Sequence, residues 1–198
     1  MLTLLLAAIA AGTMAPKTEC DRLAITRYVT ALRTAQGEHK ESNLGEESAR
    51  RFFRAMPDSF GCFNEVFGYP REAPGPLYDE PQRHFLFPQM AVAVPRQAFA
   101  LKLVRLSVGA RWEADQTGAL QHAVRTVLDE TPVVFVGELK KLDATAEYSV
   151  WRFLFGASHP SNELLTPELK KQLCSLSQRS CELHAKAYAA ALAVEEHH

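Results

Sequence analysis

The last third of the chain carries the pattern that most narrows the fold. Apolar and small side chains recur there every three or four residues, which places them on one face of an α-helix. These residues are Leu169, Leu173, Leu176, Ser180, Leu183, Ala187 and Ala190. Thr166 followed by Pro167 is a strong start signal, because Thr caps a helix and Pro fits its first position. The pattern predicts one long helix that begins at Pro167, ends near Val194 and packs against other helices.

The same periodicity predicts helices along most of the remaining chain. They span 18–35, 46–56, 59–67, 94–108, 112–128, 133–142 and 144–155. The helix at 144–155 is apolar nearly all round, which is typical of a central helix. The apolar run at 133–136 also suits a buried strand, but the Glu-Leu-Lys-Lys-Leu sequence after it favours a helix. A chain of 198 residues suits one domain. We therefore expect a compact all-α bundle of about seven or eight helices in a single domain, 16–198.

The N-terminus has the pattern of an export signal. Residues 2–10 read LTLLLAAIA, a run of signal-peptide length that is too short to span a bilayer. Ala8 and Ala10 form a small-x-small cleavage site, and residues 13–15 form a second. No Lys or Arg precedes the run, so a buried N-terminal helix is the alternative. We expect residues 1–15 to be a cleaved signal peptide, and the mature chain to be soluble in the periplasm without membrane insertion.

Four cysteines, Cys20, Cys62, Cys174 and Cys181, predict two disulfides in an exported chain. In an unbroken C-terminal helix, the Cα atoms of Cys174 and Cys181 would lie roughly 10 Å apart, beyond the ~7 Å limit for a bridge. In that case Cys20 and Cys62 must each reach the C-terminal helix. Metal binding is the rival interpretation, but no C-x-x-C pair occurs and only His184 lies near a cysteine in sequence. We therefore expect no metal site.

Charge and motifs narrow the function. The net charge of −1 argues against a general nucleic-acid binder, which needs a basic excess. The sequence has no G-x-S-x-G, H-E-x-x-H, P-loop or dinucleotide motif, so we expect no cofactor and favour a protein without catalysis. An enzyme that cleaves envelope glycans would need paired carboxylates, for which Glu113 with Asp115, or Asp79 with Glu80, are the candidates. Acidic residues at the start of a helix are, however, also favoured by its dipole.

The longest irregular stretch is the candidate partner-binding surface. Residues 68–81 read GYPREAPGPLYDEP and are rich in turn-forming Pro and Gly. This loop carries aromatic and charged residues of the kinds that interfaces use, and other such residues lie elsewhere in the chain. The predicted partner-binding residues are Tyr69, Arg71, Tyr78, Asp79, Trp112, Asp115 and His159.

One segment resembles a known pattern. Residues 148–160 read YSVWRFLFGASHP and are similar to the "sFWxFLFDGxHP" sequence of small, exported, all-helical bacterial proteins. The stretches 67–70, 75–78 and 112–115 resemble other parts of that pattern. Gly156-Ala157 stands where the pattern has Asp-Gly. The resemblance implies an exported helical protein and names no chemistry.

These observations favour a periplasmic binding protein without catalysis. Exported proteins of this size include immunity proteins, which neutralise antibacterial toxins by covering their active sites. We expect such a role, with a secreted toxin as the protein partner. A glycan hydrolase of the cell envelope is the alternative. A third possibility, a helical assembly or chaperone-like factor, predicts a large exposed apolar patch.

Overall fold

A computed structural model describes residues 20, 22–38, 45–68, 74–78, 86–112, 116–156 and 165–195. Within these ranges the chain forms ten helices and no strand. They are α1 (Arg22–Glu38), α2 (Glu46–Ala55), α3 (Phe60–Phe67), α4 (Leu86–Ala93), α5 (Arg96–Ser107), α6 (Gln116–Glu130), α7 (Pro132–Leu139), α8 (Ala144–Leu154), α9 (Pro167–Leu176) and α10 (Gln178–Glu195). The all-α prediction is confirmed, but the predicted count of seven or eight helices is wrong.

Helix α4 was not among the predicted helices, although it contains Pro88. Pro88 lies in the first turn of α4, where the N–H that proline lacks has no intrahelical partner in any case. The helix can therefore begin at Leu86 and continue through Pro88.

The predicted C-terminal helix is two helices. Ser177 has extended backbone angles (φ −160°, ψ 111°) and ends α9. Its hydroxyl then accepts a hydrogen bond from the Ser180 N–H at 3.1 Å, which caps the start of α10. The apolar spacing continues across Ser177, so the periodicity alone did not reveal the break.

This break changes the disulfide pairing. Cys174 and Cys181 are bonded to each other, with 4.8 Å between their Cα atoms, because the chain turns between them. Cys20 is bonded to Cys62, with 4.9 Å between the Cα atoms. The prediction that all four cysteines form disulfides is confirmed. Cys20 and Cys62 were expected to reach the C-terminal helix only if that helix is unbroken, and the break at Ser177 removes this condition.

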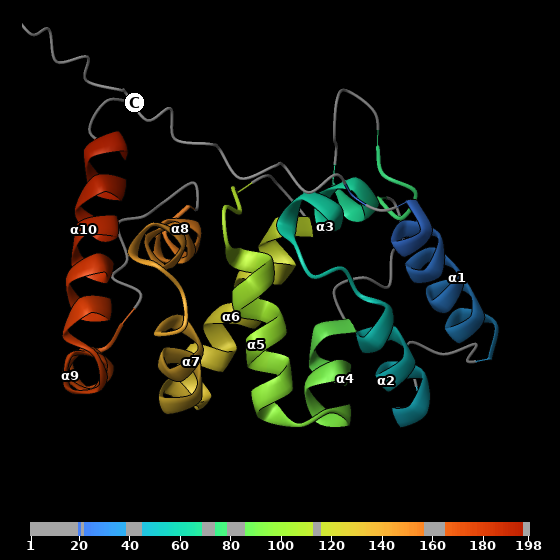
Figure 1. Cartoon of the computed structure of the whole chain (residues 1–198), viewed down its shortest axis with the longest axis horizontal. Helices are drawn as coiled ribbons and strands as arrows, with labels where there is room; N and C mark the ends of the chain where they lie inside the picture. The colour runs from blue at the N-terminus through green and yellow to red at the C-terminus, as the bar shows by residue number, and fades with distance from the viewer. Residues whose placement is uncertain are drawn as a thin grey trace, which may run out of the picture.

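The helices follow one another along the long axis of the molecule nearly in chain order (Figure 1). Helices α1 and α2 lie toward one end, α3 to α6 in the middle, and α7 to α10 toward the other end (Figure 1). The buried apolar side chains form one continuous cluster, from Tyr28 in α1 to Ala191 in α10. Trp151 of α8 is fully buried, with its ring edge-on to Phe135 and His184. Helix α8 therefore has a buried face, but it lies toward one end of the molecule (Figure 1), so the prediction of a central position is not confirmed.

Local signals set several helix ends. Asp143 Oδ1 accepts a hydrogen bond from the Ala146 N–H at 2.8 Å and caps α8. Thr166 Oγ1 accepts one from the Leu169 N–H at 3.2 Å and caps α9. Gly109 follows α5 with φ of +70°, a left-handed conformation that favours glycine. Among the described residues, no helix has the length and apolar character needed to cross a membrane.

Candidate functional site

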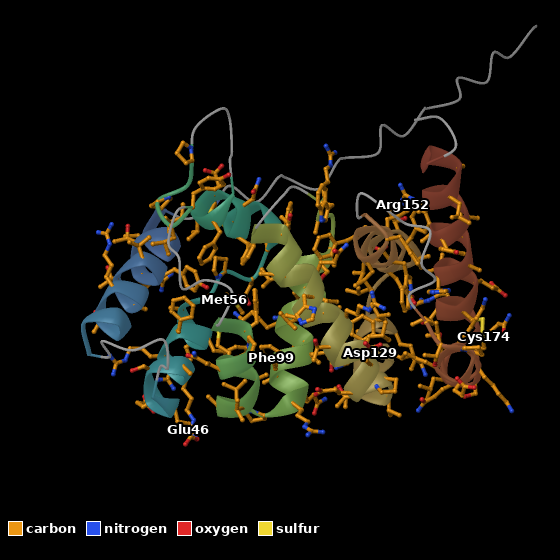
Figure 2. The ribbon with its side chains drawn as sticks, turned by 180° about the vertical axis from the view of Figure 1, so that it is seen from behind. Glu46, Met56, Phe99, Asp129, Arg152 and Cys174 are labelled. Carbon is orange, nitrogen blue, oxygen red and sulfur yellow. A yellow bond between two sulfur atoms is a disulfide. The ribbon has the colours of Figure 1, made fainter. Side chains whose placement is uncertain are left out.

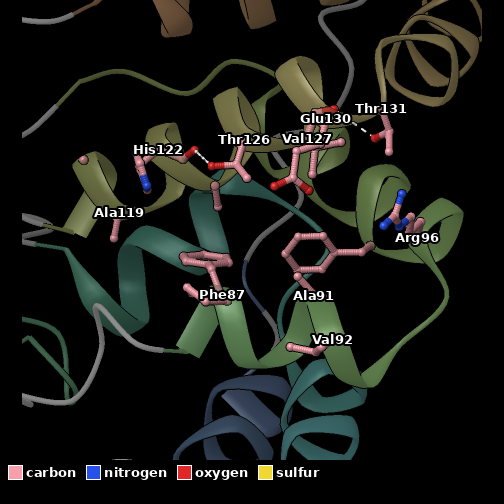
Figure 3. Close-up of a pocket in the computed structure, with 14 residues that line it drawn as sticks. Phe87, Ala91, Val92, Arg96, Ala119, His122, Thr126, Val127, Glu130 and Thr131 are labelled. Atoms are coloured by element: carbon pink, nitrogen blue, oxygen red, sulfur yellow. Dashed lines mark hydrogen bonds between the residues drawn. The ribbon is translucent and has the colours of Figure 1, made fainter.

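A pocket of about 640 Å³ lies between α4, α5 and α6, and we call it the α4–α6 pocket. Its size is within the range of sites that bind ligands or side chains of a partner. Helix α6 forms one wall and α4 the other. Phe87 and Ala91 face α6 across the pocket, as Figure 3 shows.

The sequence of α6 creates the space. The face of α6 that lines the pocket carries three small residues, Gly118, Ala119 and Ala123. Gly118 and Ala119 are adjacent, and Ala123 follows Ala119 by about one helical turn. None of the three has more than one side-chain carbon, so none fills the gap between α6 and α4. A larger apolar residue at these positions would close the pocket.

The floor of the pocket is apolar. Phe87 of α4 and Phe99 of α5 are only 6% and 4% exposed, because their rings also belong to the core. Val92 lies at the edge on α4 and is 85% exposed, which makes it an apolar side chain that packing inside the chain does not cover. The pocket therefore joins a buried aromatic floor to an exposed apolar edge.

Three charged or titratable side chains surround the floor. His122 lies toward one end of the pocket, Arg96 toward the other, and Glu130 between them (Figure 3). Within the described part of the chain, no hydrogen bond or ion pair engages these three side chains. The two threonine hydroxyls of the pocket, in contrast, have hydrogen-bond partners: Thr126 and Thr131 each donate to a backbone carbonyl of α6. The rim thus presents one cation, one carboxylate and one imidazole to a binding partner.

A fourth charge, Asp129, lies next to the rim. Partial burial raises the pKa of its carboxyl, and the charge of Glu130 adds to this effect. Arg125 and His122 act in the opposite direction; Arg125 Nε lies 3.9 Å from Asp129 Oδ2. The negative charge at this end of α6 is therefore partly balanced by neighbouring side chains.

The α4–α6 pocket can hold an apolar group and pair with charges beside it. It combines an apolar floor with a few polar groups that fix orientation, the usual composition of a binding site. Among the described residues, no group of three His, Cys, Asp or Glu side chains could hold a metal ion.

Most of the predicted partner-binding residues lie outside the described residues. These are Tyr69, Arg71, Asp79, Asp115 and His159, and the same is true of the candidate carboxylates Glu80 and Glu113. Tyr78 is half-buried, and its N–H donates to the Gly75 carbonyl at 3.0 Å. Trp112 is 40% exposed. Neither Tyr78 nor Trp112 lines the α4–α6 pocket.

Sequence reasoning missed this pocket, although two signals were present. Small residues recur on one face of α6, and α4 carries apolar residues on more than one face, with Met90 buried and Val92 exposed. Comparison with known proteins finds no family model, no curated protein and no solved structure that matches the chain.

Proposed function

We propose that the chain is a periplasmic binding protein without catalysis, which neutralises a secreted toxin by holding part of it in the α4–α6 pocket. One observation carries the proposal: an apolar floor opens to the surface beside three charged or titratable side chains that have no partner in the described chain. Protein interfaces combine these two properties, an apolar centre and a polar rim.

Two features support export. The apolar run at 2–10 has the length of a signal peptide. All four cysteines are paired, and disulfides persist in oxidising compartments such as the periplasm.

The helices that form the pocket are tied to the rest of the fold. Arg50 Nε on α2 donates to the Ala93 carbonyl at the end of α4, at 2.9 Å. Gln121 Nε2 on α6 donates to the Phe153 carbonyl on α8, at 2.7 Å. Both walls are therefore held by groups outside the pocket. Such preorganisation favours tight binding, since little conformational freedom is lost when the partner docks.

The test begins with capture of the partner. The purified, oxidised chain serves as bait in periplasmic extract of the source organism, and retained proteins are identified by mass spectrometry, with the product of the neighbouring gene examined first. Each retained protein is then expressed in the periplasm of a test bacterium, alone and together with this chain.

We expect one stoichiometric partner that stops growth when alone and is harmless when co-expressed with this chain. The proposal is wrong if no retained protein is toxic, or if co-expression gives no protection. It is also wrong if the purified chain itself cleaves envelope glycans, because that result would favour the glycan hydrolase.

A further inference from the structure

We infer that the α4–α6 pocket takes an amphipathic helix, whose apolar face lies along α6 between α4 and the open surface. The inference rests on the proposed function in one respect, namely that the ligand is part of a protein. The new element is the kind of protein segment that the pocket recognises.

The shape of the pocket is the first argument. Its lining runs along α6 from Gly118 to Glu130 and includes Thr131, the next residue. At 1.5 Å of rise per residue, this stretch is about 20 Å long, or between three and four helical turns. The lining on α4 is shorter, from Phe87 to Val92. The pocket is therefore a groove with one long helical wall, a shape that fits an elongated occupant.

The small residues on α6 are the second argument. Two helices pack with their axes about 8–10 Å apart, and small contact residues allow the shorter distances. Gly118, Ala119 and Ala123 leave room for the backbone of an incoming helix to approach α6. Its apolar side chains would then reach Phe87 and Phe99 on the floor.

Charge complementarity is the third argument. Glu130 and Arg96 carry opposite charges along the rim and have no hydrogen bond or ion pair in the described chain. A helix with one basic and one acidic side chain on its flank can pair with both. An acyl chain with an anionic headgroup suits this rim less well, since it would gain from Arg96 but be repelled by Glu130. The mixed rim therefore favours a peptide.

The position of Val92 agrees with this mode of binding. Helix-in-groove recognition uses apolar anchors at i, i+3 or i+4, and i+7 on the bound helix. Val92 projects from the shorter wall and is 85% exposed, so a helix seated in the groove would cover it. Val133 on α7, 58% exposed, does not line the groove and offers a matched control.

The experiment uses a designed peptide as the probe, so it does not depend on capture of the natural partner. The peptide has about 14 residues, enough to span the groove, with leucines on one helical face and lysine and glutamate on the flanks. A scrambled peptide of the same composition spreads the leucines around the helix. Binding to the oxidised full chain is measured by fluorescence anisotropy, and the binding site is mapped by ¹H–¹⁵N chemical shifts. Palmitate is titrated separately.

We expect the patterned peptide to bind about tenfold or more tightly than the scrambled one, with shifts confined to α4, the start of α5 and α6. Val92→Asp should weaken this binding by about tenfold, whereas Val133→Asp should leave it unchanged. Thermal unfolding of both variants verifies that they fold.

Three results would overturn the inference: equal binding of the two peptides, equal effects of the two valine variants, or saturable binding of palmitate in the groove without binding of the patterned peptide. These results are separable from failure of the proposed function. A toxin that is neutralised equally well by Val92→Asp would leave the neutralising role standing, but it would contradict the α4–α6 pocket as the surface that binds the toxin. Absence of any toxin would contradict the proposed function, while the peptide experiment would still decide the inference.

Discussion

Arg179, at the start of α10, forms an ion pair with the fully buried carboxylate of Glu147 on α8, with 2.8 Å between Nε and Oε2. Ser180 Oγ donates to the other oxygen of the same carboxylate at 2.5 Å. Arg179 also donates through Nη2 to the carbonyls of Leu139, the last residue of α7, and of Lys140 and Leu142, which follow α7. This one side chain therefore joins α10 to both α7 and α8. Figure 2 shows the side chains of this end of the molecule around the labelled Arg152 and Cys174.

Removal of Arg179 should destabilise the fold, because the buried carboxylate of Glu147 would lose its ion-pair partner. Arg179→Ala should lower the free energy of unfolding by about 2 kcal/mol or more, below the usual cost for a fully buried pair because the arginine is itself partly exposed. Lys171→Ala, an exposed change on α9, should alter stability by less than about 0.5 kcal/mol. Urea unfolding measures both.

The double variant Arg179→Ala/Glu147→Gln separates charge from shape. Because glutamine carries no charge, it should recover part of the stability lost in Arg179→Ala. An equal or greater loss in the double variant would show that the buried charge is not the cause.

The two disulfides should contribute unequally to stability. Cys20 and Cys62 are 42 residues apart in sequence, whereas Cys174 and Cys181 are 7 apart. In the chain-entropy account, the longer loop gives about 4 kcal/mol and the shorter about 2 kcal/mol. Replacing each pair with serines and measuring urea unfolding tests this order. A larger loss from the C-terminal pair would contradict it.

Helix positions were largely predictable from sequence, because local signals determine them. The caps at Asp143 and Thr166 and the left-handed turn at Gly109 depend on nearby residues, and they lie at the ends of helices that were predicted from sequence. The break at Ser177 was not predictable from periodicity. The apolar spacing continues through it, and the start of α10 is held by Glu147, 33 residues away in sequence from Ser180.

The pocket is harder to predict than the helices, because it is a space between helices that no side chain fills. Small residues such as Ala119 and Ala123 are compatible with two arrangements. Either a neighbouring helix packs closely against them, or they face an open groove. Only the placement of α4, the helix that sequence analysis missed, decides between the two. The loop that sequence reasoning favoured as the binding surface lies mostly outside the described residues.

Tyr28 should make the protein sensitive to alkaline pH. Its ring packs against Phe52 and Phe67, and burial raises the pKa of its hydroxyl well above the ordinary value of 10.0. In the unfolded chain the hydroxyl loses its proton near its ordinary pKa, while in the folded chain it stays protonated. Stability is therefore fully present below about pH 10 and falls as the pH rises further.

Tyr28→Phe removes this proton, so the variant should lose less stability between pH 9 and pH 11 than the parent chain. Urea unfolding across this range, with each variant referred to its own stability at pH 8, measures the difference. Identical pH profiles would show that Tyr28 does not contribute.

Two glycines with equal space around them should respond to alanine in opposite directions. A Cβ atom added at Gly109 or at Gly137 would meet no atom within 4 Å. Gly109 has φ of +70°, so Gly109→Ala should destabilise the fold by about 1 kcal/mol. Gly137 lies inside α7, so Gly137→Ala should stabilise it by about 0.5–1 kcal/mol. Thermal unfolding of both variants checks the signs, and changes in the same direction would contradict this account.

The central claim is that the α4–α6 pocket is the surface that binds the partner. Its most direct test is the affinity of the captured partner for Val92→Asp and Val133→Asp, measured by titration calorimetry on folded, oxidised protein. The account predicts a loss of about tenfold or more for Val92→Asp and parental affinity for Val133→Asp. Parental affinity in both variants, or an equal loss in both, would contradict it.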